Sequence, residues 1–271
     1  MKKISIITCC KNGASTLKRC FNSIKKQTEF ENLEWIFIDD CSNDNSLGLA
    51  FTLFNEFDNI KIASTVTSKH KKNAFNLALD LVEGDFFLNL DVDDELVDEA
   101  IKKIFFHLKN FSDREAVLFG LSLYPNSQIV GDKFGNTESK TYHQMTVSNG
   151  VKGDKYFVIK TSSLAGWRYP DIDGYVPEGA IFLDIDRKFE CRFIDEPLRI
   201  YHPESQISKK KVNFIKQRFN KSHGRKWYHL EVLRLFKEDK LDASLWVKTR
   251  VLLKFLGYLA LSTSRRMSIK L

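Results

Sequence analysis

Four short apolar runs alternate with segments of helical periodicity in the first part of the chain, and this alternation constrains the fold more than any other feature. The apolar runs cover residues 4–8, 35–38, 60–65 and 86–90. Apolar residues three and four positions apart indicate helices at 14–26, 46–57 and 73–82. Strands without a polar face that alternate with helices are typical of parallel sheets covered on both sides. We therefore expect an α/β fold with a mostly parallel central sheet flanked by helices.

Polar loops follow three of these strands, at the edge where a parallel sheet binds its ligands. The loops read Cys9-Cys10-Lys11-Asn12-Gly13, Asp39-Asp40-Cys41-Ser42-Asn43-Asp44 and Asp91-Val92-Asp93-Asp94-Glu95. Carboxylates this close repel one another unless a cation or hydrogen-bond donors neutralise them, which indicates a bound divalent metal. The alternative is helix capping, by Ser42 or Asp44 before residue 46 and by Asp94 before 95–108. Two clusters at one edge favour the metal.

The composition is that of a packed protein of enzyme size. The chain has 271 residues, of which 43% are hydrophobic, with 13 Gly and 5 Pro, and this excludes collagen-like, low-complexity and disordered classes. Its five cysteines form no C-x-x-C pair and have no histidines at zinc-finger spacing, so neither a disulfide framework nor a structural zinc is expected. The apolar run at 4–10 is too short for a signal peptide. We therefore expect a cytoplasmic protein.

The order and spacing of these motifs resemble the family 2 glycosyltransferases, which have the Rossmann-like GT-A fold. The first part of the resemblance rests on Ile4-Ser5-Ile6-Ile7-Thr8, Asn12-Gly13, Gln27-Thr28, residues 38–46, Glu83-Gly84-Asp85-Phe86 and the Asp91-Val92-Asp93 motif of D-x-D type. The second part, residues 174–179 and 193–202, resembles the acceptor side of the same family. Together they cover most of residues 1–204.

The resemblance implies transfer of a sugar from a nucleotide diphosphate donor, with inversion, to a glycan or lipid-linked glycan in surface polysaccharide synthesis. Asp40 would accept the uracil N3–H of a UDP-sugar, with Asp39 beside it. Asp93 would bind Mn²⁺ or Mg²⁺, while Asp91 would face the ribose and diphosphate and also reach the metal. The implied nucleotide-sugar site comprises Thr8, Cys9, Lys11, Asn12, Asp39, Asp40, Lys72, Asp91 and Val92.

The acceptor side of the resemblance supplies a base and a further metal ligand. Glu178 would remove the proton of the acceptor hydroxyl as that oxygen attacks the anomeric carbon. Asp173 and Asp184 are alternative bases, and Glu178 could instead serve only as a favourable first-turn residue behind Pro177. His202 is a candidate metal or diphosphate ligand, although a lone histidine is more often structural.

Other residues bear on donor and acceptor recognition. Lys11 stands where the family commonly has tyrosine, and Phe75 where it commonly has arginine, so the base of the donor stays open. His70, Lys71 or Lys72 could replace that arginine beside the diphosphate. Trp167 and Tyr175 are candidates for an aromatic platform under the acceptor sugar. Residues 121–151 are expected to form a loop or β-excursion over the acceptor.

The chain is expected to divide into a catalytic domain at 1–204 and a basic helical tail at 205–271. The domain would comprise a nucleotide-sugar half at 1–108 and an acceptor half at 109–204. The tail carries 17 Lys and Arg residues against 4 Asp and Glu, whereas the preceding residues carry 25 against 31. Nucleic acid is not an expected partner, because the tail has no nucleic-acid-binding motif and the rest of the chain is acidic.

Within the tail, two helices are expected on either side of Gly224, over 209–219 and 227–236, and a further helix over the apolar stretch 245–261. Lys248, Arg250 and Lys254 interrupt that stretch, so we expect a helix lying on the anionic inner face of the cytoplasmic membrane, anchored by Arg265 and Arg266, rather than a span. The alternative is a helix docked on the catalytic domain or on a second copy, which would make a homo-oligomer. Two other functions stay open: a sugar nucleotidyltransferase, and a non-catalytic docking subunit with the same fold.

Overall fold

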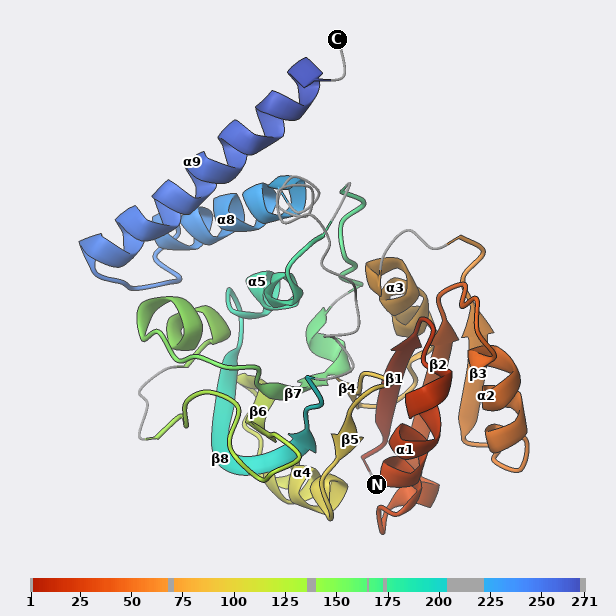
Figure 1. Ribbon diagram of the computed structural model, residues 1–271. Helices are drawn as coiled ribbons and strands as arrows, with labels where there is room; N and C mark the ends of the chain where they lie inside the picture. Colours follow the sequence, from red (N-terminus) through yellow and green to blue (C-terminus); the bar gives the residue numbers. More distant parts are fainter. Residues whose placement is uncertain are drawn as a thin grey trace. The chain divides into compact units, whose positions relative to one another are not determined.

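The computed structural model describes residues 2–67, 71–135, 140–164, 166–172, 175–203 and 222–268, with only the backbone for 262–268 (Figure 1). The chain forms two compact units. The first contains residues 1–136, 152–166 and 191–206, and the second contains 137–151, 167–190 and 207–271. The second unit therefore includes two segments that precede the expected boundary at residue 204, in addition to the tail.

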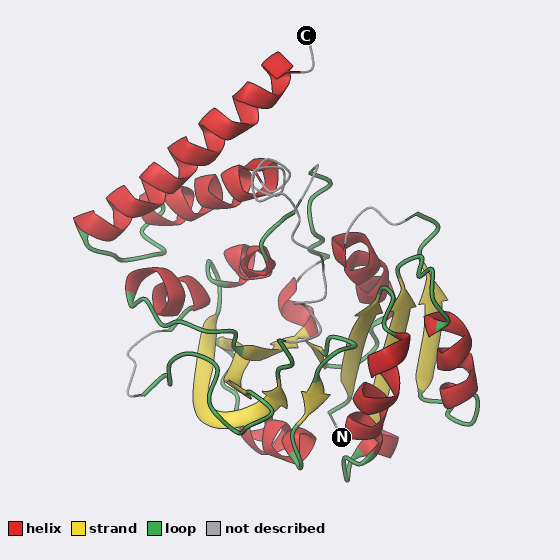
Figure 2. Ribbon diagram, viewed as in Figure 1, coloured by secondary structure: helices red, strands yellow, loops and turns green. Residues whose placement is uncertain are grey.

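An eight-stranded sheet forms the centre of the first unit within the described residues, in the order β3-β2-β1-β4-β7-β6-β8-β5 (Figure 2). The strands are β1 (Ile4–Cys10), β2 (Leu33–Asp39), β3 (Ile60–Ser64), β4 (Phe86–Asn89), β5 (Glu95–Leu96), β6 (Glu115–Leu123), β7 (Tyr156–Lys160) and β8 (Glu190–Ile200). Strands β3, β2, β1 and β4 are parallel, as expected from their apolar sequences. Strand β7 runs antiparallel to β4 and β6, and β5 runs antiparallel to β8, so the sheet is mixed.

Helices lie on both faces of the parallel strands, as predicted. The helices of this unit are α1 (Ala14–Lys25), α2 (Ser46–Phe54), α3 (Lys71–Leu81) and α4 (Ala100–Lys109), with 3₁₀ turns at Phe30–Asn32 and Thr161–Leu164. Helices α1, α2 and α4 bury their apolar residues in one core with Ile6 and Trp35. Helix α3 packs on the opposite face, where the ring of Phe75 meets Phe87 of β4 at 6.3 Å between centroids. The parallel strands are therefore covered on both sides, and their carboxyl ends open onto loops.

The second unit is helical in its described residues. Its elements are a π-helix at Gln144–Ser148, a 3₁₀ turn at Glu178–Ile181, α5 (Phe182–Ile185), α8 (Ser222–Lys237) and α9 (Leu245–Ser268). Its apolar core joins Ala180 and Leu183 to Val232 and Leu235 of α8 and to Val251 of α9. The segment 121–151, expected as a loop or β-excursion, contains the end of β6, a β-bridge between Leu123 and Ile129, and the π-helix.

Gly224 lies inside α8, so the expected boundary between two helices does not fall at this residue. The first of those helices, expected from residue 209 to 219, lies outside the described residues. A Cβ atom at Gly224 would lie 2.1 Å from the carbonyl oxygen of Tyr175. The glycine therefore lets the helix backbone approach the backbone of residues 175–176 closely, and it does not end the helix. The other expected helix, over 245–261, lies within α9.

Candidate functional site

The loops after β1 and β2 are joined at the carboxyl edge of the sheet by backbone-to-side-chain hydrogen bonds. Asn12, whose φ is 56°, accepts the backbone N–H of Asn43 at 2.7 Å. Its own N–H donates to Ser42 Oγ at 2.9 Å, and Gly13 N–H donates to Ser46 Oγ at 2.9 Å. The N-cap of α2 is Asn45, not Asp44 or Ser42, but the carboxylate of Asp44 accepts the first N–H groups of both α1 and α2.

The loop after β4 packs against this pair of loops. A Cβ atom at Gly13 would lie 2.8 Å from a methyl carbon of Val92 and 2.8 Å from the sulfur of Cys10. Only a glycine fits at this contact without displacing its neighbours. The residues that the sequence analysis placed after three separate strands are therefore adjacent in the structure.

Asp39 and Asp40 lie buried at the end of β2, each 4% exposed. Asp40 accepts the hydroxyl of Thr65 at 2.9 Å, and Asp39 accepts the N–H of Ser42 at 3.0 Å through Oδ2. The other oxygen of Asp39, Oδ1, is buried and has no hydrogen-bond partner among the described residues. A buried carboxylate oxygen without a donor is costly, so this atom is suited to accept a hydrogen bond from a bound ligand.

Asp91, Asp93 and Asp94 form an acidic cluster in which the carboxylate oxygens lie within 4.8 Å of one another. Lys71 Nζ lies 2.6 Å from Asp91 Oδ1, and the amide of Asn89 donates to the same oxygen at 2.9 Å. Burial favours the neutral acid, but Lys71 and Asn89 outweigh it and lower the pKa of Asp91. Asp91 is therefore a carboxylate at neutral pH.

Asp94 is held by groups at the end of β8. Its carboxylate lies 3.3 Å from the guanidinium of Arg199 and accepts the backbone N–H of His202 at 2.9 Å. Burial outweighs these contacts and raises the pKa of Asp94 to about 7. Arg199 is itself buried between Asp94 and Asp154, to which it pairs at 3.0 Å. Asp94 thus holds the acidic loop against the neighbouring strand.

This donor set fits a hard divalent cation. Three carboxylates from one short loop offer oxygen ligands, which Mn²⁺ and Mg²⁺ prefer, and a cation would add to the positive charge that Lys71 and Arg199 supply. Asp94 is engaged with Arg199, so Asp91 and Asp93 are the members best placed to hold the ion.

His202 lies next to the acidic loop but contacts a different carboxylate. Its Nε2 lies 2.8 Å from Glu95 Oε1, while its backbone N–H binds Asp94. The clustered ligand atoms in the described residues are those of the three aspartates and do not include His202. The role of His202 as a metal ligand stays a prediction. To bind a metal through Nε2, His202 would have to release Glu95.

The remaining residues of the expected donor site differ in accessibility. The hydroxyl of Thr8 is buried and bonds to the indole N–H of Trp35 at 2.9 Å, so it lies in the core. Burial raises the pKa of Cys9 to about 12, which keeps its thiol neutral. Lys11 is exposed on the first loop. Lys72 is buried, whereas its neighbour Lys71 reaches Asp91.

Glu178 begins the 3₁₀ turn of the second unit, directly after Pro177, and its side chain is exposed. Its carbonyl oxygen accepts the hydroxyl of Tyr169 at 3.2 Å. Of the two alternative bases, Asp184 pairs with Arg187 at 2.9 Å, and Asp173 lies outside the described residues. Glu178 is therefore both the first residue of the turn and an exposed carboxylate. This position is compatible with a role as the base and with a role as a favourable first-turn residue.

The two aromatic residues proposed for the acceptor lie in the second unit. Trp167 is partly buried and meets Tyr169 edge to face, with 4.7 Å between ring centroids. Tyr175 is 42% exposed, and the guanidinium of Arg225 lies 5.7 Å from its ring. Tyr175 thus presents more of its ring to solvent than a core residue does.

Sequence reasoning assigned no role to Arg199, and it named Lys71 only as one of three alternatives. The signal for Arg199 was a cation within the largely apolar end of β8, between Leu198 and Ile200, because a buried guanidinium requires carboxylate partners. For Lys71 the sequence held no comparable signal, since neighbouring residues of a helix point in different directions and the phase of α3 was unknown.

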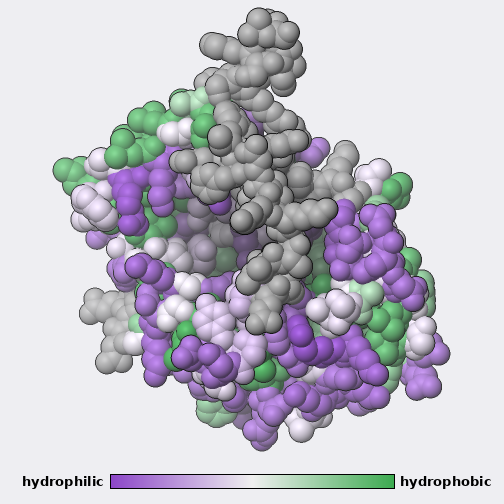
Figure 3. All heavy atoms as spheres, viewed as in Figure 1, coloured by the Kyte–Doolittle hydropathy of each residue, from purple (hydrophilic) through white to green (hydrophobic). Residues whose placement is uncertain are grey.

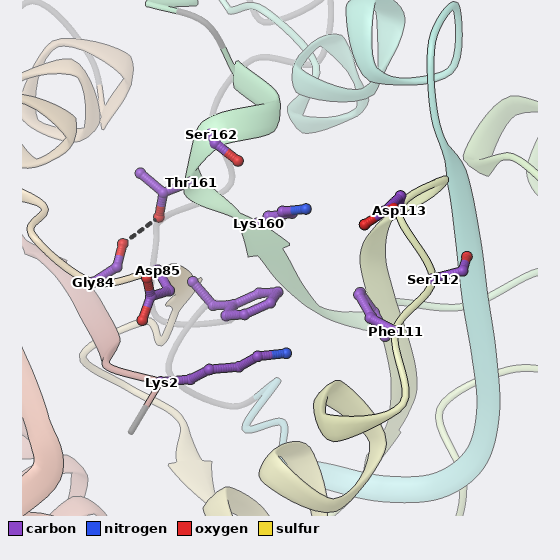
Figure 4. A pocket seen from close by; sticks show the side chains of 10 residues that line it. Lys2, Gly84, Asp85, Phe111, Ser112, Asp113, Lys160, Thr161 and Ser162 are labelled. Atoms are coloured by element: carbon purple, nitrogen blue, oxygen red, sulfur yellow. Dashed lines mark hydrogen bonds between the residues drawn. The ribbon is translucent and has the colours of Figure 1, made fainter.

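A pocket of the first unit lies at the other end of the sheet (Figure 4). It is lined by residues that precede β1 and β4 and that follow antiparallel β7, among them Lys2, Asp85 and Thr161. Thr161 donates to the carbonyl oxygen of Gly84 at 2.6 Å, which joins β7 to the start of β4. This pocket is therefore at the amino ends of the parallel strands and is separate from the carboxylate edge.

Comparison with known proteins agrees with this fold. The profile of Glycosyl transferase family 2 matches residues 5–152. The crystal structure of TarS 1-349 from S. aureus in complex with UDP-GlcNAc superposes with a TM-score of 0.65 at 20% identity, covering 94% of this chain and 72% of that one. This similarity establishes a GT-A fold.

Two curated relatives extend over most of the chain. A GalNAc(5)-diNAcBac-PP-undecaprenol beta-1,3-glucosyltransferase of Campylobacter jejuni is 26% identical, over 74% of this chain and 65% of its own length. The UDP-Glc:alpha-D-GlcNAc-diphosphoundecaprenol beta-1,3-glucosyltransferase WfgD of Escherichia coli is 27% identical, over 80% of this chain and 84% of its own. Among curated relatives the chain covers between 16% and 84% of the relative's length.

The GT-A fold and the family match together define the class as glycosyltransferases. The chain belongs to glycosyl transferase family 2. This membership favours glycosyl transfer over the nucleotidyl transfer and the non-catalytic docking that the sequence analysis left open.

Proposed function

We propose that this glycosyltransferase transfers a sugar from a UDP-sugar, with inversion and with a divalent metal, to a lipid-linked or polymeric glycan of the cell surface. The observation that carries the proposal is the junction of three loops at the carboxyl edge of β1, β2 and β4. That junction lies in the same unit as the aspartate cluster and as Asp39 Oδ1, a buried oxygen for which the described part of the chain holds no hydrogen-bond donor. The relatives with undecaprenol-linked acceptors support the acceptor class.

At the donor end, Asp39 and Asp40 are proposed to bind the base, and the loop of Lys11 and Asn12 to border it. Asp39 Oδ1 supplies an acceptor for an N–H group such as the uracil N3–H. Cys9 lies at the end of β1, and Val92 lies in the loop after β4, so both are on the edge that carries Asp39 and Asp40. Lys71 and Lys72, at the start of α3, are proposed to supply positive charge for the diphosphate.

At the diphosphate end, Asp91 and Asp93 are proposed to hold Mn²⁺ or Mg²⁺, with His202 as a further ligand. A divalent cation there neutralises charge on the departing diphosphate. The protein's own contribution is orientation, since Arg199 and the backbone of His202 hold Asp94 and thereby the loop that carries both ligands.

On the acceptor side, Glu178 is proposed to take the proton from the attacking hydroxyl. A general base has to be accessible to the acceptor hydroxyl and held in a defined position. The carboxylate of Glu178 is exposed, and its backbone belongs to the turn that follows Pro177. Trp167 and Tyr175 are proposed to pack against the apolar face of the acceptor sugar.

The tail is proposed to bind the anionic inner face of the cytoplasmic membrane. Exposed apolar side chains gather along α9 (Figure 3). They are Leu245, Trp246, Leu252, Leu253, Leu256 and Leu259. Lys248, Arg250 and Lys254 lie on the same helix, which suits an interfacial helix on anionic lipid. Among the described helices, none is long and apolar enough to cross a bilayer.

Thermal unfolding tests the donor and the metal. The protein is heated with UDP-, GDP-, CMP- and dTDP-sugars, each with and without Mn²⁺, because ligands that bind the folded state raise the midpoint. We expect a rise with a UDP-sugar that depends on Mn²⁺ and that disappears in Asp93→Asn. Asp98→Asn, a matched change at an 83% exposed aspartate nearby in the sequence, should keep it. A rise with another nucleotide, or one independent of metal, contradicts the proposal.

Transfer to an undecaprenol-linked saccharide acceptor tests the base. Glu178→Gln keeps the size of the side chain but cannot accept the proton, so turnover should fall at least a hundredfold, within the range for general bases. The donor-induced rise in midpoint should persist in this variant. Retained turnover in Glu178→Gln, with loss in Asp184→Asn, would assign the base to Asp184.

A further inference from the structure

A buried chain of three polar side chains crosses the second unit, and the proposed reaction does not use it directly. Asp186 Oδ2 lies 2.6 Å from His143 Nδ1, and His143 Nε2 lies 3.1 Å from the hydroxyl of Tyr228. His143 is fully buried and Asp186 is 5% exposed. Buried polar networks of this kind are costly unless every member is satisfied, so their presence in a small helical unit requires a reason.

The contacts of Asp186 set which atom donates in its bond with His143. Asp186 also accepts the backbone N–H groups of Tyr142 and His143, at 3.2 and 2.8 Å, so its carboxylate acts as an acceptor throughout. Nδ1 of His143 therefore carries a proton, and in the neutral ring Nε2 accepts the hydroxyl proton of Tyr228. Burial, and to a lesser degree the charge of Asp186, raises the pKa of Tyr228, which keeps this hydroxyl protonated.

The Tyr228 end of this hydrogen-bonded network lies against Gly179, the residue that follows the proposed base. A Cβ atom at Gly179 would lie 2.9 Å from the hydroxyl oxygen of Tyr228 and 2.9 Å from a ring carbon of Tyr142. Tyr142 is in turn stacked on Phe182, with ring centroids 4.3 Å apart. The backbone of the turn at Glu178–Ile181 therefore packs against Tyr142 and Tyr228. The hydrogen bond with His143 holds Tyr228 in place.

Another contact restrains the same turn. The hydroxyl of Tyr169 donates to the carbonyl oxygen of Glu178. The side chain of Glu178 is exposed, and the positions of its Cα and Cβ atoms follow from this backbone. Restraints on Gly179 and on the carbonyl of Glu178 thus act on the peptide unit that joins the two residues.

We propose that Tyr228, held by His143 and Asp186, is a positioning residue that sets the direction of the Glu178 carboxylate. The inference rests on the proposed role of Glu178 as the base. It assigns to α8, which sequence analysis treated only as part of a basic tail, a function in the reaction. It also explains why residue 179 is a glycine, since any side chain there would displace Tyr142 or Tyr228.

Kinetics of Tyr228→Phe test the proposal, because this variant removes only the hydroxyl and keeps the ring. We expect kcat to fall about tenfold, since small displacements of a catalytic group have large effects on rate. KM for donor and acceptor should stay within about twofold, because neither ligand contacts Tyr228 in the proposal. The matched control is Tyr258→Phe, which removes another tyrosine hydroxyl that α8 contacts, through Arg225 at 2.7 Å. An equal effect of the two variants on kcat overturns the proposal.

A double variant distinguishes positioning from a general structural role. If Tyr228 acts through Glu178, adding Tyr228→Phe to Glu178→Gln should lower kcat no further, because the two changes remove the same contribution. A further tenfold loss in the double variant would show that Tyr228 acts independently of Glu178, and the proposal would be wrong.

Hydrogen exchange without substrate separates this proposal from the proposed function. In Tyr228→Phe we expect faster exchange of the amides at 178–182, with unchanged exchange in the sheet of the first unit. If the wild type transfers no sugar but exchange responds in this way, the proposed function fails while the restraint on the turn stands. Unchanged exchange at 178–182 overturns the positioning proposal whatever the wild type transfers.

Discussion

The ammonium of Lys71, at the first position of α3, lies 2.6 Å from Oδ1 of Asp91, at the first position of the acidic loop after β4. The side chain of Lys71 is 50% exposed and that of Asp91 is 29% exposed. Lys71 therefore supplies the positive charge that this carboxylate needs when no cation is bound. A metal ion at Asp91 and Asp93 has to bind in the field of that ammonium.

Lys71→Met should therefore tighten metal binding. Removal of a positive charge close to the ligand oxygens reduces the repulsion of a divalent cation, and for a half-exposed group we expect an affinity for Mn²⁺ about tenfold higher. Titration calorimetry with Mn²⁺ alone measures this change. Lys26→Met removes a lysine that pairs with Asp98 at 2.8 Å on the surface, and it should leave the Mn²⁺ affinity unchanged. Weaker Mn²⁺ binding by Lys71→Met would contradict the placement of the metal.

Glu34 should contribute stability that depends on pH. Its carboxylate is buried on β2, where it pairs with Lys61 at 2.6 Å and accepts the N–H of Glu83 at 3.0 Å and the hydroxyl of Ser5. Burial opposes ionisation, but these donors outweigh it and lower the pKa of Glu34 below the ordinary value of 4.5. A lowered pKa in the folded state means that the stabilisation is complete above the unfolded pKa and is lost as the pH falls through the folded value.

Urea unfolding of Glu34→Gln from pH 7 to pH 3.5 measures this contribution. At pH 7 the variant should be less stable by about 2 kcal/mol, because one partner of a buried charged network is removed. The difference from wild type should shrink below about pH 4.5, where the unfolded carboxyl is protonated. Glu83→Gln, at a site 62% exposed where solvent screens the charge, should change stability much less than Glu34→Gln does. A difference for Glu34→Gln that stays constant with pH would refute the charge-based explanation.

The sequence predicted the parallel half of the fold well because its signal is local. Apolar runs such as the one at 4–8 specify strands buried on both faces, and parallel strands necessarily bring the residues that follow them to one edge. The strand pattern alone therefore places Asp39, Asn12 and Val92 close together. The antiparallel strands β6, β7 and β8 were not predicted in this detail, since their pairing depends on contacts distant in sequence.

The partners of individual side chains were harder to predict than the loops that carry them. His202 was predicted as a candidate metal or diphosphate ligand, and its contact with Glu95 could not be predicted, because it depends on the pairing of β8 with β5. The network around Asp186 has no local signature either, since its members come from three segments of the second unit. Gly224 was interpreted as a helix boundary because glycine is a poor helix former. In the structure its lack of a side chain lets α8 pack closely against the backbone of Tyr175.

A pair of glycine variants tests that interpretation of Gly224. Gly224→Ala should destabilise the protein by about 1–3 kcal/mol, because its Cβ would overlap the carbonyl oxygen of Tyr175 at 2.1 Å and force the backbones apart. Gly257→Ala, inside α9, meets no atom within 4 Å among the described residues. This change should stabilise α9 by about 0.5–1 kcal/mol, the helix preference of alanine over glycine. Thermal unfolding compares the two, and equal effects would contradict the close packing at Gly224.

Membrane binding through α9 should depend on its exposed leucines. Leu253 and Leu256 are 63% and 47% exposed, and Val251 on the same helix is buried against the core of the second unit. Replacing both leucines with serine removes apolar surface that would enter the lipid, and leaves the buried face unchanged. Because burial of each leucine contributes about 1.5–3 kcal/mol when complete, we expect binding at least tenfold weaker.

Sedimentation with vesicles that contain anionic lipid measures this effect. Wild type should bind these vesicles, and binding should weaken in neutral vesicles and at high salt, because the lysines and arginines of the tail contribute by charge. Phe106→Ser, at a side chain 67% exposed on α4, removes comparable apolar surface elsewhere and should leave binding unchanged. If the leucine variant binds vesicles like wild type but changes from a dimer to a monomer by light scattering, α9 pairs with a second copy of the chain and the membrane proposal is wrong.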